Sequence, residues 1–79
     1  MSENVNDTVR AIAAAKTIID GRDPIAKQAQ ILVTAEHAIA AVLVAVMGDA
    51  RLAAGMLNNG LVPGIEERLA YYASKGGAA

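Results

Sequence analysis

Glu36 and His37 are the first residues of this 79-residue chain to suggest chemistry, because they stand together just ahead of a long apolar run. Adjacent residues on a helix point about 100° apart, so these two side chains are poorly placed to hold one metal ion. The chain contains no cysteine and a single histidine, and neither Glu-x-x-His nor His-Glu-x-x-His occurs in it. We therefore expect no metal ion, no cofactor and no catalytic histidine.

Nucleophiles and phosphate-binding loops are equally hard to find. The two serines, Ser2 and Ser74, lie near the ends of the chain, and no cysteine accompanies a base. The glycine-bearing stretches, Asn59-Gly60 and Pro63-Gly64, match neither a P-loop nor a dinucleotide fingerprint. The sequence predicts that the protein is not an enzyme.

The charges do not favour a nucleic-acid partner. Seven basic and eight acidic residues give a net charge of −1, and the basic residues are spread along the chain. A helix-turn-helix reading would make the last helix the recognition helix, yet Glu66 and Glu67 stand at its start, where they would repel phosphates. We expect no binding to DNA.

Caps and glycines divide the chain into helices. Asp23 and Asp49 are suited to capping helix N-termini, and Gly21, Gly48 and Gly60 are suited to ending helices in a left-handed conformation. With Pro24 and Pro63 as first helical residues, we expect helices over about 5–20, 24–47, 50–59 and 63–74, followed by a flexible tail over 75–79.

These elements predict an all-α fold: one domain over 1–79, a small bundle of three or four helices around the long helix 24–47. A domain of this size buries only about 60% of its unfolded surface. Here 54% of the residues are hydrophobic and no disulfide is available. Self-association is a common remedy for such a chain, so we expect a homo-oligomer.

The apolar run from Ala38 to Met47 raises the question of a membrane. A transmembrane helix needs about 20 predominantly apolar residues, whereas extension of this run meets Glu36 on one side and Arg51 on the other. The acidic N-terminus also differs from a secretory signal. We expect a cytoplasmic protein that does not cross a membrane.

An uncovered face of helix 24–47 is the expected seam of the oligomer. Its first half carries Lys27, Gln30, Thr34 and His37 on one face, and the same face continues with small apolar residues that allow close helix approach. The predicted interface residues are Ile39, Ala41, Leu43, Val44, Ala45 and Gly48.

Two ionisable residues stand on apolar faces. Glu36 lies among Leu32, Ile39 and Leu43, and Lys16 lies on the apolar stripe of helix 5–20. In a tight hairpin that turns near Arg22 they are offset by eight residues, roughly 12 Å along the axis. For Glu36 three interpretations stay open: an ion pair in a core or interface, a contact in a ligand pocket, or simple exposure.

The first functional hypothesis is a non-enzymatic binding or assembly module that associates with itself through helix 24–47. The alternative is a small-ligand site, for example for a nucleotide-like molecule, at a boundary between subunits. Its predicted lining is Glu36, Arg68, Tyr72 and Lys16. The partners considered are therefore a second copy of the chain, another protein or a small molecule.

Overall fold

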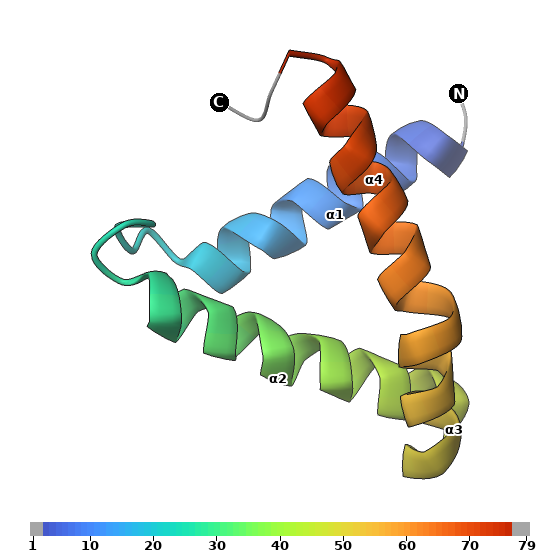
Figure 1. Ribbon diagram of the computed structural model, residues 1–79. Coiled ribbons are helices and arrows are strands. Elements are labelled where there is room, and N and C mark those ends of the chain that lie inside the picture. Colours follow the sequence, from blue (N-terminus) through green and yellow to red (C-terminus); the bar gives the residue numbers. More distant parts are fainter. Residues whose placement is uncertain (1–2, 77–79) are drawn as a thin grey trace. The chain divides into compact units, whose positions relative to one another are not determined.

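The structure is a computed structural model that describes residues 3–76 of the chain, with side-chain surroundings from residue 5 onward. Within that range it contains helices and turns but no strand, so the all-α prediction is confirmed (Figure 1). The helices are α1 (Glu3–Ile19), α2 (Gln28–Met47) and a helical stretch composed of α3 (Ala50–Met56), η1 (Leu57–Leu61) and α4 (Val62–Ser74). The packing of these helices into a bundle around α2 stays a prediction.

The chain divides into two compact units, Met1–Ile39 and Ala40–Ala79, with the boundary inside α2. Unit 1 holds α1 and the first half of α2, which meet at the connecting loop and separate with distance from it (Figure 1). Ile31, 9% exposed, is the buried hydrophobic residue of the described part of this unit. Unit 1 therefore leaves most of its apolar side chains uncovered.

Arg22 joins the end of α1 to α2. The helix ends through two residues in the left-handed region, Asp20 (φ 53°) and Gly21 (φ 70°), as predicted for Gly21. The Arg22 guanidinium then donates to the carbonyls of Ile18 and Ile19, which the helix itself leaves unsatisfied. Its Nη2 also donates to Oγ1 of Thr34 on α2 at 3.2 Å, which ties the two helices together at their loop.

The start of α2 differs from the predicted boundary. Oδ1 of Asp23 accepts hydrogen bonds from the backbone N–H groups of Ile25 (2.8 Å) and Ala26 (3.3 Å), as a cap should. The residues it caps, 24–27, form a separate turn, and α2 begins at Gln28. The N–H of Lys27 donates to the carbonyl of Asp23 (2.8 Å) and closes this first turn, and the regular α-helix starts one turn later than predicted.

In unit 2, Gly48 and Asp49 end α2 and start α3. Gly48 adopts φ 76°, and Oδ1 of Asp49 accepts from the N–H groups of Arg51 (2.6 Å) and Leu52 (3.4 Å). Leu43 and Ala53, each 6% exposed, are the buried hydrophobic residues described in this unit. The break between the second and third helices is therefore set by local backbone chemistry.

The predicted break at Gly60 is wrong, because the helical stretch continues through η1 into α4. Gly60 is not among the residues with positive φ, and the N–H of Val62 donates to the carbonyl of Leu57 five residues back, the π-helical pattern. Pro63 has no N–H for Asn59 and its ring would crowd that carbonyl in an α-helix. Widening the helix just ahead of Pro63 accommodates the proline without a break.

The Met56 side chain lies over Gly60. A Cβ added at Gly60 would lie only 2.5 Å from Sδ of Met56. After α4 the chain turns at Lys75 and Gly76, and the predicted tail lies outside the described residues from 77 onward.

Two glycines of unit 2 offer a matched test of these backbone assignments. Gly48→Ala places a Cβ in the left-handed region and should lower the free energy of unfolding by about 1–2 kcal/mol. Gly55→Ala, inside α3 and also with open space around it, should raise it by about 0.5–1 kcal/mol. Chemical unfolding followed by circular dichroism measures both, and equal effects of the two substitutions would contradict the assigned helix boundary.

Candidate functional site

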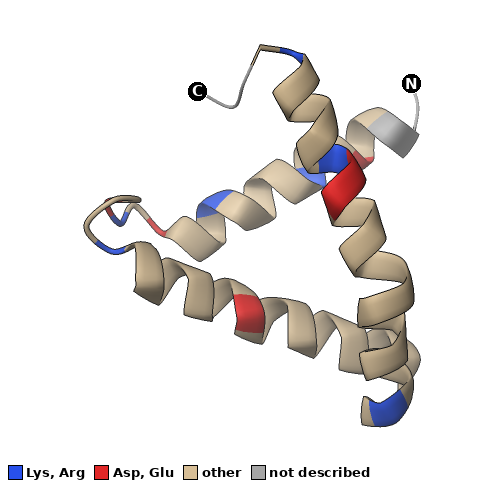
Figure 2. Cartoon of the chain, in the orientation of Figure 1, with Lys and Arg blue, Asp and Glu red and all other residues tan. Residues whose placement is uncertain are grey.

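The most unusual surface of the chain is α2 itself. Helix α2 is long and apolar enough to span a membrane by length and composition, yet only 6% of that apolar stretch is buried. Glu36 is its one charged side chain, seen as the single red segment on α2 in Figure 2. From Ala38 to Met47 the helix is apolar on all sides, and such a stretch needs cover from protein or lipid.

The predicted interface residues divide into open and covered positions. Ala41, Val44, Ala45 and Gly48 are exposed, with Val44 at 47%. Ile39 is half-buried, and Leu43, 6% exposed, is covered by its own chain. The exposed part of the predicted interface is therefore the face of α2 that carries the small residues. Leu43 does not belong to it.

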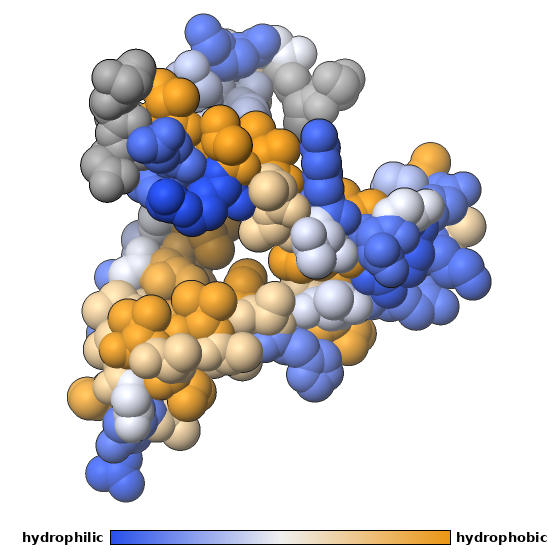
Figure 3. Space-filling view, turned by 180° about the vertical axis from the view of Figure 1, so that it is seen from behind, coloured by the Kyte–Doolittle hydropathy of each residue, from blue (hydrophilic) through white to orange (hydrophobic). Residues whose placement is uncertain are grey.

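Apolar side chains on the other helices are open as well. Figure 3 shows hydrophobic residues at the surface of the chain. On α4 they form a stripe at helical spacing, in which Ile65, Leu69 and Tyr72 are all exposed, Leu69 at 61%. Single exposed apolar residues are ordinary, but continuous stripes on several helices point to surfaces that are covered in use.

The aromatic end of α4 was not predicted from the sequence. Tyr71 and Tyr72 pack edge to face with ring centroids 6.1 Å apart, and Nζ of Lys75 lies 5.5 Å from the Tyr71 centroid. This cation–π contact joins residues four apart, one helical turn, so the spacing of Tyr71 and Lys75 was the available signal. It orders the end of the helix but adds no reactive group.

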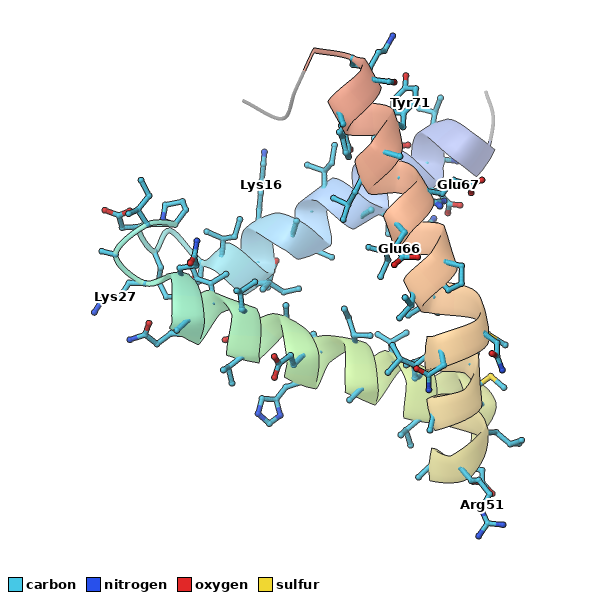
Figure 4. The ribbon with its side chains drawn as sticks, viewed as in Figure 1. Lys16, Lys27, Arg51, Glu66, Glu67 and Tyr71 are labelled. Atoms are coloured by element: carbon cyan, nitrogen blue, oxygen red, sulfur yellow. The ribbon has the colours of Figure 1, made fainter. Side chains whose placement is uncertain are left out.

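The charged residues of the predicted ligand site are all exposed. Lys16 projects from α1 away from the first half of α2 (Figure 4), which agrees with the offset expected for a hairpin. Glu36 is exposed too, and the ion pair recorded among residues 5–76 is Arg10–Asp7 (3.0 Å), not Lys16–Glu36. Within unit 1, therefore, Lys16 and Glu36 do not form a site together.

Arg68 and Tyr72 lie on the other unit, four residues apart on α4, and both are exposed. Nη1 of Arg68 reaches back to the carbonyl of Gly64 at 3.4 Å, a long hydrogen bond on the helix surface. That contact ties Arg68 to its own helix, whereas Tyr72 meets Tyr71. The predicted ligand pocket stays a prediction.

A shallow groove of about 260 Å³ follows one face of η1 and α4. Its lining consists of Gly60, Leu61, Gly64, Ile65 and Arg68. The two glycines, four residues apart, lower the helix surface between larger neighbours, a spacing that the sequence analysis did not use. Arg68 is the only charged side chain in this lining, and one helix alone supplies every wall.

Metal-binding side chains do not gather in the described part of the chain. Among residues 3–76 no group of three histidine, cysteine, aspartate or glutamate side chains could hold a metal ion. His37 is exposed at the surface of α2. Comparison of the chain with models of protein families, with curated proteins and with solved structures finds no match.

The groove beside Arg68 gives a prediction about small anions. Because one exposed arginine in an open groove offers no enclosed set of donors, millimolar inorganic phosphate should leave the melting temperature unchanged. Thermal denaturation with and without phosphate measures this. A shift that disappears in Arg68→Ala would contradict it and would favour the ligand hypothesis.

Proposed function

We propose that the protein is a non-enzymatic assembly module that associates with copies of itself through α2. The observation that carries this proposal is the exposure of α2, an apolar helix of which only 6% is buried in the single chain. Burying an apolar side chain such as Val33 or Val44, each about half exposed, would stabilise a complex by roughly 1 kcal/mol per residue. Several such side chains on one helix give a substantial driving force.

A second copy is favoured as the partner because the chain needs cover in more than one place. Only Ile31, Leu43 and Ala53 are buried hydrophobic residues in the described part of the chain, which is less core than a stable small domain requires. Self-association can bury these exposed residues without any other partner, because copies of the chain are always present together. Alanine and glycine on the open face, Ala41, Ala45 and Gly48, permit close approach of helix backbones.

The length and hydropathy of α2 favour a bilayer as a second candidate. Against it stands Glu36, near the middle of the helix, where insertion of a charged side chain costs about 2.5–3.5 kcal/mol. A protein seam accommodates that carboxylate with an opposite charge, which lipid tails do not offer. We therefore rank the soluble assembly first and propose a cytoplasmic location with it.

The mass of the particle tests the proposal. Light scattering in detergent-free buffer should give a stable multiple of 8.1 kDa that persists at micromolar concentrations. Val44→Asp, which places a charge on the open face, should lower the mass of the particle because a buried unpaired carboxylate is costly. Asn59→Asp, an exposed position outside α2, is the control. A wild-type particle of 8.1 kDa at all concentrations would overturn the proposal.

Partition between water and lipid separates the two candidates. When the protein is mixed with vesicles of phosphatidylcholine and phosphatidylglycerol and floated in a density gradient, we expect it to stay in the aqueous fractions. The physical reason is the cost of burying Glu36 in hydrocarbon. Flotation of the wild type with the vesicles, made firmer by Glu36→Leu, would favour the membrane candidate.

A further inference from the structure

The apolar stripe of α1 is largely exposed. It repeats at intervals of four and three residues, the spacing of a and d positions in a coiled coil. The stripe is Val5, Val9, Ile12, Lys16 and Ile19. Its first three members are at least half exposed and Ile19 is half-buried, so a partner helix could lie along most of its length. Lys16 is the one charged residue in the stripe.

A stripe with the same intervals runs along α2 and the turn before it. It consists of Ile25, Ala29, Leu32, Glu36 and Ile39, and Glu36 is its one charged residue. Ile25 (87%) and Leu32 (56%) are exposed, as are Ala29 and Glu36. The buried Ile31 belongs to another face of the helix, about 120° from the centre of this stripe. Contact with the chain's own α1 therefore leaves the stripe open.

Each residue of the α2 stripe follows the corresponding residue of the α1 stripe by 20 positions in the sequence. Side-by-side parallel packing of the two helices would oppose every apolar position of one stripe with an apolar position of the other, and Lys16 with Glu36. Parallel packing cannot occur within one chain, because Arg22 and Asp23 hold the connecting loop in a turn that reverses the chain. The complementary helix must come from another molecule.

We propose that α1 of one chain packs in parallel on α2 of a second copy, with Lys16 of each chain paired to Glu36 of the other. This inference rests on the proposed function and adds, to the open small-residue face of α2, a second contact of that self-association with a stated register. Two chains related by a two-fold axis make the contact twice, so the assembly is closed and carries two ion pairs. The small-residue face of α2, with Ala41 and Val44, is left for further contacts.

Charge complementarity selects this arrangement over its competitors. Parallel pairing of α1 with α1 would oppose Lys16 with a second Lys16, and parallel pairing of α2 with α2 would oppose Glu36 with a second Glu36. Antiparallel pairing of α1 with α2 in coiled-coil register brings both charges against apolar residues. The side chains flanking the two stripes up to residues 15 and 35 are uncharged: Asn6, Thr8, Ala13 and Ala15 on α1, and Ala26, Gln28, Val33 and Ala35 beside the α2 stripe.

Charge reversal in separate chains tests the pairing. Lys16→Glu and Glu36→Lys should each raise the dissociation constant at least about tenfold, because each opposes like charges twice in the dimer. An equimolar mixture of the two variants should associate as the wild type does, since a mixed dimer contains opposite charges at both contacts. Analytical ultracentrifugation measures all three. Lys27→Glu, exposed but outside the stripe, is the matched control (Figure 4).

Disulfide cross-linking tests the register of α1 on α2 independently of the charge variants and of how well they fold. The chain has no cysteine of its own, so single cysteines give unambiguous products. Ile12→Cys mixed with Leu32→Cys should form a disulfide between the two variants on mild oxidation, whereas neither variant alone should link to itself. Self-linking of Ile12→Cys would show α1 paired with α1 and would overturn the proposal.

The outcomes separate this inference from the proposed function. Rescue by the double variant Lys16→Glu/Glu36→Lys but not by the mixture of single variants would mean that the pair forms within one chain, which overturns the inference. An oligomer that shows neither rescue nor the mixed disulfide would overturn the register alone and leave self-association standing. A wild-type monomer at every concentration would remove both proposals together.

Discussion

Exposure of an apolar helix to water is the condition on which the rest of this structure depends. Helix α2 carries one charge in its 20 residues, and the chain that contains it covers only a small part of it. Its stability cannot come from alternation of polar and apolar faces, the usual condition of a helix at a protein surface. Either other helices or lipid must replace the water, and every functional possibility considered for the protein is a choice between these covers.

The position of Glu36 bears on that choice in an indirect way. A buried ion pair contributes little net stability, because desolvation of both charges offsets their attraction. The pair has a stronger effect on competing registers of the two helices. A register that buries one of the two charges without the other is destabilised by several kcal/mol. A single charge on each of two otherwise apolar stripes therefore selects one partner surface and one register, as a polar residue in a coiled-coil seam does. Exposure of Lys16 and Glu36 in the single chain agrees with a role that begins on association.

The sequence predicted helix ends correctly where the end depends only on the residues of one turn. Gly21, Gly48 and Asp49 acted as expected because their effects involve only the backbone of their own turn. Gly60 does not end a helix, because a π-helical segment lies just ahead of Pro63 and accommodates the proline. The helical stretch therefore continues, and Gly60 does not adopt a left-handed conformation. The start of α2 lies one turn later than predicted, although the Asp23 cap itself acts as expected.

The candidate site was less predictable because it depends on which faces remain uncovered. Periodicity assigned Leu43 and Val44 alike to the seam, but only the exposures of the folded chain separate them: Leu43 is buried and Val44 is open. Likewise, the offset between Lys16 and Glu36 disfavoured an ion pair within a hairpin from the sequence alone, while the exposure of both stripes required coordinates. The parallel register uses both kinds of information, since the spacing comes from the sequence and the availability of each side chain comes from the structure. A chain that leaves two matching stripes uncovered and holds them antiparallel by its own loop satisfies them most directly with a second copy of itself.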